Sequence, residues 1–218
     1  MSRWEIERSL IVQTSLKLVG KGMVVGKAGN ISQRVIEDGN TDLLAITPTS
    51  TYYESLSADD IAIVDFDGNL VEGNLPPSSE TKLHIAIYKA RKDVGAVVHT
   101  HSVYASAASV AALGIPAILE EEVALLGGNI RVAEYAPSGS QELAQNAVEA
   151  LGDRNAVIMA NHGALCVGMT LRDALDSCDL LEKAAQVYLL ALSAGRVNPL
   201  SSEAVAQAKL NFDRLRKT

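Results

Sequence analysis

The stretch VVHTHSVYA, residues 97–105, places two histidines at the end of a β-branched apolar run and just before an alanine-rich segment. The run predicts a strand over 94–101, and the segment after it predicts a helix over 103–113. Side chains two residues apart in a strand point to the same face, so His99 and His101 are expected to converge on one point. Convergent imidazoles suit a divalent metal ion, and two unconnected surface or core histidines are the simpler alternative.

The composition of the chain bounds its class. Its 218 residues are 48% hydrophobic and 21% charged, which is typical of a globular protein with a core. A net charge of −7 argues against a nucleic-acid partner, which would need a positive surface. The first ten residues carry acids and arginines in place of a signal peptide, and no apolar run reaches membrane-spanning length. We therefore expect a soluble, cytoplasmic protein with no membrane or nucleic-acid partner.

The order of helix and strand signals predicts the architecture. Helices are expected over 2–20, from the serine pair 78–79 onward, and over 103–113, 140–151, 171–194 and about 201–216. Strands are expected over 23–26, 31–36, 43–47, 61–66, 70–72, 94–101, 115–119, 130–133 and 156–160, the last one continued at 166–167. The Asp67-Gly68 pair predicts a hairpin, and no GxGxxG sequence opens a βαβ unit. These signals predict one α/β domain, residues 1–218, around a mixed or antiparallel sheet.

Two further residues could act with the histidine pair. His162 follows the buried run AVIMA and precedes a glycine, so it could supply a third imidazole, and three histidines with an open position form a catalytic zinc arrangement. Glu80 follows Ser78-Ser79 at a predicted helix start, where an ordinary helix cap is the simpler interpretation. His84 lies one helical turn after Glu80 and could pair with it, although we interpret His84 as structural.

Two loops are rich in hydrogen-bond donors. They are KAGN, residues 27–30, and TPTS, residues 47–50. Neither is a Walker A loop, because GxxxxGK[ST] does not occur in this sequence. Asparagine, threonine and serine side chains with exposed backbone amides are nevertheless the groups that bind a phosphate monoester.

Taken in order, five motifs resemble one family. AGNIS (28–32), TPTS (47–50), PSSE (77–80), HTH (99–101) and NHG (161–163) resemble the class II sugar-phosphate aldolases of the fuculose-phosphate aldolase group. Their superfamily also holds ribulose-phosphate 4-epimerases and the adducin head domain. The resemblance implies a single three-layer α/β/α domain with a largely antiparallel central sheet. It also implies a homotetramer with active sites between subunits.

The resemblance also assigns roles to residues of this chain. The implied metal ligands are Glu80, His99, His101 and His162, with Zn²⁺ as the ion and Mn²⁺ or Co²⁺ as substitutes. Glu80 is in addition the implied catalytic base. The implied phosphate-binding residues are Gly29, Asn30, Thr49, Ser50, Ser78 and Ser79. The implied reaction is the reversible cleavage of a ketose 1-phosphate, such as fuculose 1-phosphate or a related deoxy-ketose 1-phosphate, to dihydroxyacetone phosphate and an aldehyde.

The chain departs from the family's pattern where the aldehyde half of the substrate would lie. Fuculose-type aldolases use a tyrosine of the neighbouring subunit shortly before a Gly-Gly pair, whereas this chain reads AILEEEVALLGG, with Glu120, Glu121 and Glu122. A second family tyrosine near the C-terminus is also missing, and the tail offers Phe212. The family's TPTG is TPTS here. The substrate's aldehyde half is therefore expected to differ from that of fuculose 1-phosphate.

Three alternative functions share parts of this pattern. A 4-epimerase would use the same bond cleavage, but such epimerases carry Asp after the two serines, where this chain has Glu80. Related lyases or decarboxylases of sugar-acid phosphates tend to place Lys within the serine motif, which this chain lacks. An adducin-like interaction module would have lost the metal ligands, and all of them are retained here.

Overall fold

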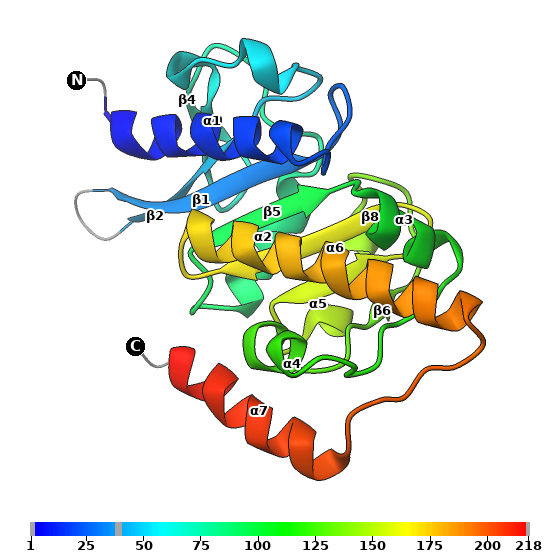
Figure 1. Cartoon of the computed structure of the whole chain (residues 1–218). Coiled ribbons are helices and arrows are strands. Elements are labelled where there is room, and N and C mark those ends of the chain that lie inside the picture. The colour runs from blue at the N-terminus through cyan, green and yellow to red at the C-terminus, as the bar shows by residue number, and fades with distance from the viewer. Residues whose placement is uncertain (1–2, 38–40, 217–218) are drawn as a thin grey trace.

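A computed structural model of the chain describes residues 3–37 and 41–216 and has an α/β fold (Figure 1). The described strands form one eight-stranded sheet in the order β4-β3-β2-β1-β5-β8-β7-β6. Every neighbouring pair is antiparallel except β6 and β7. The strands are β1 (Asn30–Glu37), β2 (Thr41–Ile46), β3 (Ala62–Asp65), β4 (Leu70–Glu72), β5 (Ala96–Thr100), β6 (Val132–Ala133), β7 (Ala156–Met159) and β8 (Gly163–Gly168). The predicted α/β class with a largely antiparallel sheet is confirmed.

Helices cover both faces of this sheet. The described helices are α1 (Glu5–Gly20), α2 (Thr81–Ala90), α3 (Val103–Val110), α4 (Glu120–Leu126), α5 (Gln141–Leu151), α6 (Leu171–Ser193) and α7 (Ser202–Leu215). Apolar side chains of α1, α3 and α6 pack on one face, and those of α2 and α5 pack on the other. In β5 the alternation is direct, because Val98 faces the first group and Val97 the second. Each described helix is too short or too polar to cross a membrane.

The last helix packs at the periphery of this assembly. α7 lies beside α4 in Figure 1, and Val123 of α4 packs with Ala208 of α7. Ser201 caps α7 by accepting a hydrogen bond from the backbone N–H of Ala204, so the predicted C-terminal helix is confirmed. The Asp67-Gly68 hairpin is confirmed as well: it joins β3 to β4, and Asp65 accepts the backbone N–H of Asp67.

Two predicted strands are wrong. The segment Met23–Gly26 is irregular, because Gly22 and Gly26 have φ values of 69° and 65°, which interrupt an extended ladder. The segment 115–119 is reduced to a single bridge between Ile115 and Ile130. Pro116 follows that bridge and has no N–H to continue it.

One helix was not predicted, and the boundaries of α2 and β5 differ from the expectation. The helix over 120–126 was not predicted, although its three glutamates in the first turn and Gly127 after its end are typical helix signals. The α2 helix begins at Thr81 with Glu80 in the N-cap position, one residue later than the serine pair indicated. Strand β5 ends at Thr100, so His101 lies just beyond it. Residue 2, the first of the predicted opening helix, lies outside the described residues.

Candidate active site and metal centre

Three imidazoles meet at the end of β5. His99 is the penultimate residue of that strand, His101 follows it, and His162 lies in the turn between β7 and β8. Their ligand nitrogens all lie within 4.8 Å of one another. Gly163 makes this convergence feasible, because a Cβ there would lie only 2.5 Å from the carbonyl oxygen of Thr100. A larger residue would therefore push His162 away from β5.

The donor set fits a divalent metal ion. His99 Nδ1 lies 2.9 Å from the carbonyl oxygen of Ala164, which can only accept, so Nδ1 carries the proton and the Nε2 lone pair points away. That lone pair faces His101 Nε2 at 2.9 Å and Glu80 Oε2 at 3.2 Å. Two nitrogens on a tetrahedral zinc ion lie about 3.3 Å apart, and the nitrogens of His99 and His101 are 2.9 Å apart here. A cation at their common centre would relieve the repulsion between these lone pairs.

Burial keeps the imidazoles in the form that a metal requires. It lowers the pKa of His99 to about 3, although the nearby Glu80 carboxylate opposes this effect. Burial also lowers the pKa of His101, and the neighbouring His162 acts in the same direction. Neutral imidazoles have the free lone pair that a metal ion needs.

The carboxylate of Glu80 is held inside this cluster. Glu80 is 3% exposed, its Oε2 accepts a hydrogen bond from Asn30 Nδ2 at 2.9 Å, and its Oε1 accepts one from Ser138 Oγ at 2.7 Å. Burial by itself would raise the pKa of Glu80, but the imidazole of His99 and the hydrogen bonds from Asn30 and Ser138 lower it. The side chain makes no cap hydrogen bond to its own helix. Glu80 is thus more than a helix-start acid.

Three loops bring hydrogen-bond donors to the same place. Asn30 pairs with His99 across β1 and β5, and a Cβ at the preceding Gly29 would lie 2.7 Å from the carbonyl oxygen of His99. The loops 47–50 and 76–79 are joined by backbone hydrogen bonds, from Ser78 N to Thr47 O at 3.1 Å and from Thr49 N to Pro76 O at 3.0 Å. Ser78 Oγ accepts the backbone N–H of Glu80 and keeps its own proton for another partner.

One residue of these loops has a strained backbone. Ser50 has φ of 54°, in the left-handed region that favours glycine. This is the position at which the resembling family carries the last residue of TPTG. The serine therefore keeps a backbone shape that glycine adopts without strain, and it adds a hydroxyl group to the pocket.

All ten site residues expected from the sequence line a single pocket of about 160 Å³. They are Gly29, Asn30, Thr49, Ser50, Ser78, Ser79, Glu80, His99, His101 and His162. Ser138 and Lys27 also line it and were not among the expected site residues. The Pro137-Ser138-Gly139 sequence is typical of a loop, and nothing in it indicates a contact with Glu80. Lys27 lies in the donor-rich loop 27–30, and its Nζ lies 4.9 Å from the ring centroid of Tyr52.

The residues that stand where the family carries its two tyrosines lie outside the histidine pocket. Glu122 is fully buried in the first turn of α4, and Glu121 pairs with Lys183 at 2.5 Å. Phe212 is buried against Gly127, where an added Cβ would lie 2.8 Å from the phenylalanine ring. None of these residues, nor Glu120, lines the pocket within one chain.

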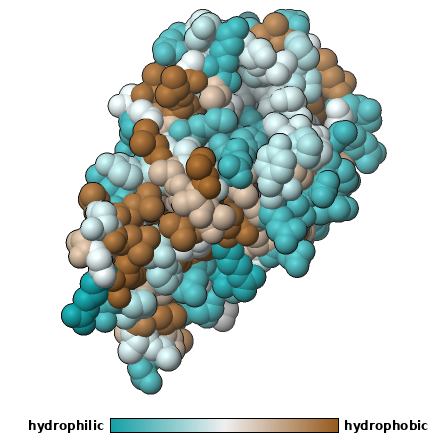
Figure 2. Space-filling view, turned by 90° about the vertical axis from the view of Figure 1, so that its right-hand side faces the viewer, coloured by the Kyte–Doolittle hydropathy of each residue, from teal (hydrophilic) through white to brown (hydrophobic). Residues whose placement is uncertain are grey.

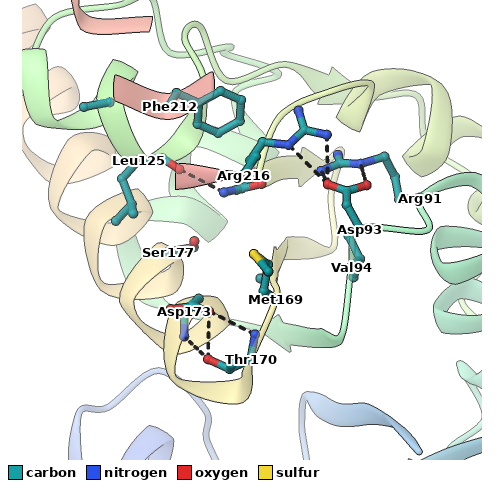
Figure 3. Close-up of a pocket in the computed structure, with 13 residues that line it drawn as sticks. Arg91, Asp93, Val94, Leu125, Met169, Thr170, Asp173, Ser177, Phe212 and Arg216 are labelled. Atoms are coloured by element: carbon teal, nitrogen blue, oxygen red, sulfur yellow. Dashed lines mark hydrogen bonds and ion pairs between the residues drawn. The ribbon is translucent and has the colours of Figure 1, made fainter. Parts of the chain in front are cut away.

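A larger pocket of about 370 Å³ lies at the opposite ends of β5 and β8 (Figure 3). Three of its charged groups are paired with one another, since Arg91 and Arg216 both donate to Asp93, and Asp173 accepts hydrogen bonds from Thr170. Much of the remaining wall is apolar, with Leu125, Met169 and Phe212 drawn in Figure 3. Its lining shares no residue with the histidine cluster, so the smaller pocket is the better candidate for chemistry.

The fold and the cluster together point to a known family, and the sequence comparison decides it. Residues 9–189 match the family described as Class II Aldolase and Adducin N-terminal domain. The chain belongs to this family. It is an enzyme of the class II aldolase type, since the named relatives that it resembles over almost their whole length are aldolases.

This class II aldolase is similar to three named aldolases. It is 35% identical over 209 residues to a 5-deoxy-D-ribulose 1-phosphate aldolase of Bacillus thuringiensis serovar kurstaki, covering 95% of each chain. It is 38% identical over 207 residues to the L-fuculose phosphate aldolase of Escherichia coli K12, covering 94% of this chain and 93% of the relative. A solved structure of an L-fuculose 1-phosphate aldolase superposes with a TM-score of 0.89 at 33% identity, covering 95% of this chain and 96% of that one.

Proposed function

We propose that this class II aldolase is metal-dependent and reversibly cleaves a ketose 1-phosphate to dihydroxyacetone phosphate and an aldehyde. The observation that carries the proposal is the meeting of three imidazoles, a buried carboxylate and three donor-rich loops in one pocket. Fuculose 1-phosphate and related deoxy-ketose 1-phosphates are the proposed substrates. The similarity to a 5-deoxy-D-ribulose 1-phosphate aldolase favours a short deoxy-ketose, and so does the absence of the family's two tyrosines.

The proposed metal ligands are His99, His101 and His162, with Glu80 completing the site before substrate binds. Zn²⁺ is the proposed ion, because it prefers neutral imidazole nitrogens in a tetrahedral arrangement, and Mn²⁺ or Co²⁺ could replace it. When bound, the ion supplies Lewis-acid stabilisation of the negative charge that develops on the substrate's oxygens.

Glu80 is the proposed acid–base group. Its surroundings keep the carboxylate ionised at neutral pH, so it is ready to accept a proton from the carbon next to the ketone. In the synthetic direction Glu80 removes that proton, and in the cleavage direction it returns it. The hydrogen bonds from Asn30 and Ser138 fix both oxygens, which limits the positions from which the proton can be transferred.

The phosphate group is proposed to bind to the neutral donors of the three loops. These donors are Gly29, Asn30, Thr49, Ser50, Ser78 and Ser79. Lys27 supplies the one lysine or arginine side chain among the residues that line the pocket, and it would balance part of the dianion's charge. Binding energy gained at the phosphate can then hold the reacting carbon next to Glu80.

A homotetramer with active sites between subunits is the proposed assembly, and the cytoplasm is the proposed location. Figure 2 views the side of the molecule where α3 and the end of α6 lie, and apolar residues gather on it. Both helices have exposed apolar side chains, which are those of Val103, Val110, Val187 and Leu190. An apolar surface patch supports association with another copy of the chain, because monomeric proteins rarely expose large contiguous apolar patches to solvent. A second copy could also supply the groups that bind the aldehyde half.

The test is the exchange of dihydroxyacetone phosphate protons with D₂O, followed by NMR with no aldehyde present. The wild type should exchange one proton stereospecifically. Glu80→Gln should exchange it about 10²–10⁴-fold more slowly while still binding dihydroxyacetone phosphate. Glu142→Gln is the matched control, because Glu142 is an exposed acid in the first turn of α5. No exchange by the metal-loaded wild type would refute the proposal.

A further inference from the structure

A line of five buried polar side chains runs from the pocket into the core between α2 and β1. Glu80 at the N-cap of α2 is followed at steps of four by His84 and Tyr88 in the helix, while Asn30 and Ser32 point to the same face of β1. His84, Ser32 and Tyr88 are completely shielded from solvent, and Asn30 is 6% exposed. Along the line, residues of the α2 side therefore alternate with residues of β1.

Each member of the line contacts the next. Glu80 Oε2 lies 2.9 Å from Asn30 Nδ2, and Asn30 Oδ1 lies 2.5 Å from His84 Nε2. His84 Nδ1 lies 2.6 Å from Ser32 Oγ, which lies 2.9 Å from the hydroxyl of Tyr88. The predicted pairing of His84 with Glu80 is therefore indirect, because Asn30 stands between them.

The carboxylate at one end fixes the direction of every hydrogen bond in the line. An ionised Glu80 can only accept, so Asn30 must turn its NH₂ group toward it and its oxygen toward His84. That oxygen can only accept, so His84 must carry its proton on Nε2. His84 Nδ1 then accepts from the Ser32 hydroxyl, and Tyr88 donates to Ser32 Oγ or to the Ser32 carbonyl oxygen at 3.0 Å. All donors in the line point toward Glu80.

The geometry of the line excludes the opposite arrangement. The His84 ring is completely buried and its two nitrogens face a hydroxyl group and an amide oxygen, so a neutral ring with a single N–H satisfies both contacts. If that proton moved to Nδ1, the bare Nε2 would face the Asn30 oxygen, and the amide would have to flip. The flipped amide would present its oxygen to the Glu80 carboxylate, where two hydrogen-bond acceptors would face each other with no proton between them.

We propose that His84 is a positioning residue, which holds the Asn30 amide in the one orientation that supports Glu80 as the base. This inference rests on the proposed function. Because Asn30 also lines the pocket, the same contact decides which end of its amide a bound substrate meets. The His84 side chain is not among the residues that line the pocket, and it acts through Asn30.

The test compares kcat and KM for proton exchange in metal-loaded variants. His84→Leu removes the donor to Asn30 and should lower kcat about 10- to 100-fold, the usual effect of losing a group that orients a site residue. KM for dihydroxyacetone phosphate should rise less than kcat falls, because Asn30 is one of six proposed phosphate-binding residues. His84→Gln keeps a donor near the position of Nε2 and should recover most of the rate. A rise in KM with unchanged kcat would overturn the proposal.

Two serine variants test the same proposal if His84→Leu does not fold. Ser32→Ala removes the donor to His84 Nδ1, so it should give a smaller loss of kcat in the same direction. Ser15→Ala is the matched control, because Ser15 is equally buried but donates to the carbonyl oxygen of Ile11 in α1, away from this line. Equal exchange rates in Ser32→Ala and Ser15→Ala would count against the proposal.

An NMR measurement tests the line without relying on activity. The chain has four histidines, so the ¹⁵N signals of labelled histidine can be assigned by comparison with His84→Gln. His84 should show the neutral form with its proton on Nε2 between pH 5.5 and pH 8, about the range in which exchange would be assayed. A proton on Nδ1 would overturn the proposal even if the enzyme is active. A wild type that exchanges nothing would refute the proposed function and this role together, whereas an active wild type with a fully active His84→Leu would refute this role alone.

Discussion

Replacing Glu122 by glutamine should change the pH dependence of stability in a way that can be calculated from the structure. The Glu122 side chain is 0% exposed, and its Oε2 accepts the backbone N–H of Ile118 at 3.2 Å. Its Oε1 has no hydrogen-bond partner among the described residues. Burial raises the pKa of this carboxyl from 4.5 to about 7, although the backbone amides of Ile118 and Leu119 oppose the rise.

The sign of the effect follows from proton binding. Between pH 4.5 and about pH 7 the folded chain holds a proton on Glu122 that the unfolded chain has already released. The free energy of unfolding therefore falls as the pH rises through this window. The distance between the two pKa values corresponds to about 3 kcal/mol, all of which is lost above pH 8. Glutamine cannot ionise, so Glu122→Gln should be free of this loss.

The assay is urea unfolding of wild type and Glu122→Gln at matched protein concentration, from pH 4 to pH 8.5. Subtracting the two free energies at each pH cancels the contributions of all other titrating groups. The wild type should lose about 3 kcal/mol relative to the variant across this range. Glu121→Gln controls for the removal of one charge from α4, because Glu121 lies on the exposed side of the helix. A difference between wild type and Glu122→Gln that stays flat, or that rises with pH, would refute the reasoning.

Three further predictions concern the metal cluster and the packing of the chain. His101→Ala should bind much less metal than the roughly one ion per chain expected for the wild type, measured by elemental analysis, and a variant with full metal content would contradict the ligand assignment. Ser50→Gly should raise the free energy of unfolding by about 0.5 kcal/mol, because glycine adopts a positive φ without strain, and a clear loss of stability would contradict this. Phe212→Ala should cost about 3–5 kcal/mol and speed up amide hydrogen exchange in α7, since the ring fills the space above Gly127; unchanged exchange in α7 would show that the helix is held by other contacts.

The parts of the fold that depend on residues close together in the sequence could be predicted from the sequence. Periodic apolar residues identified the long helix α6, and the Asp67-Gly68 turn identified the hairpin of β3 and β4. The predicted strand over 23–26 was wrong because its flanking glycines adopt positive φ values, which the apolar pattern does not register. The order of the five motifs was sufficient to identify the family.

What the sequence by itself determined about the site is its list of chemically capable residues, because HTH, NHG and the serine pair are visible as local patterns. Only the tertiary structure decided that Ser138 donates to Glu80, that Asn30 lies beside His99, and that Glu122 is buried. These contacts depend on strand register and on loops that meet after strands far apart in the chain have paired. Strand register is set by contacts along the whole sheet. A short stretch of sequence therefore shows which side chains are present, but it does not show which of them come into contact.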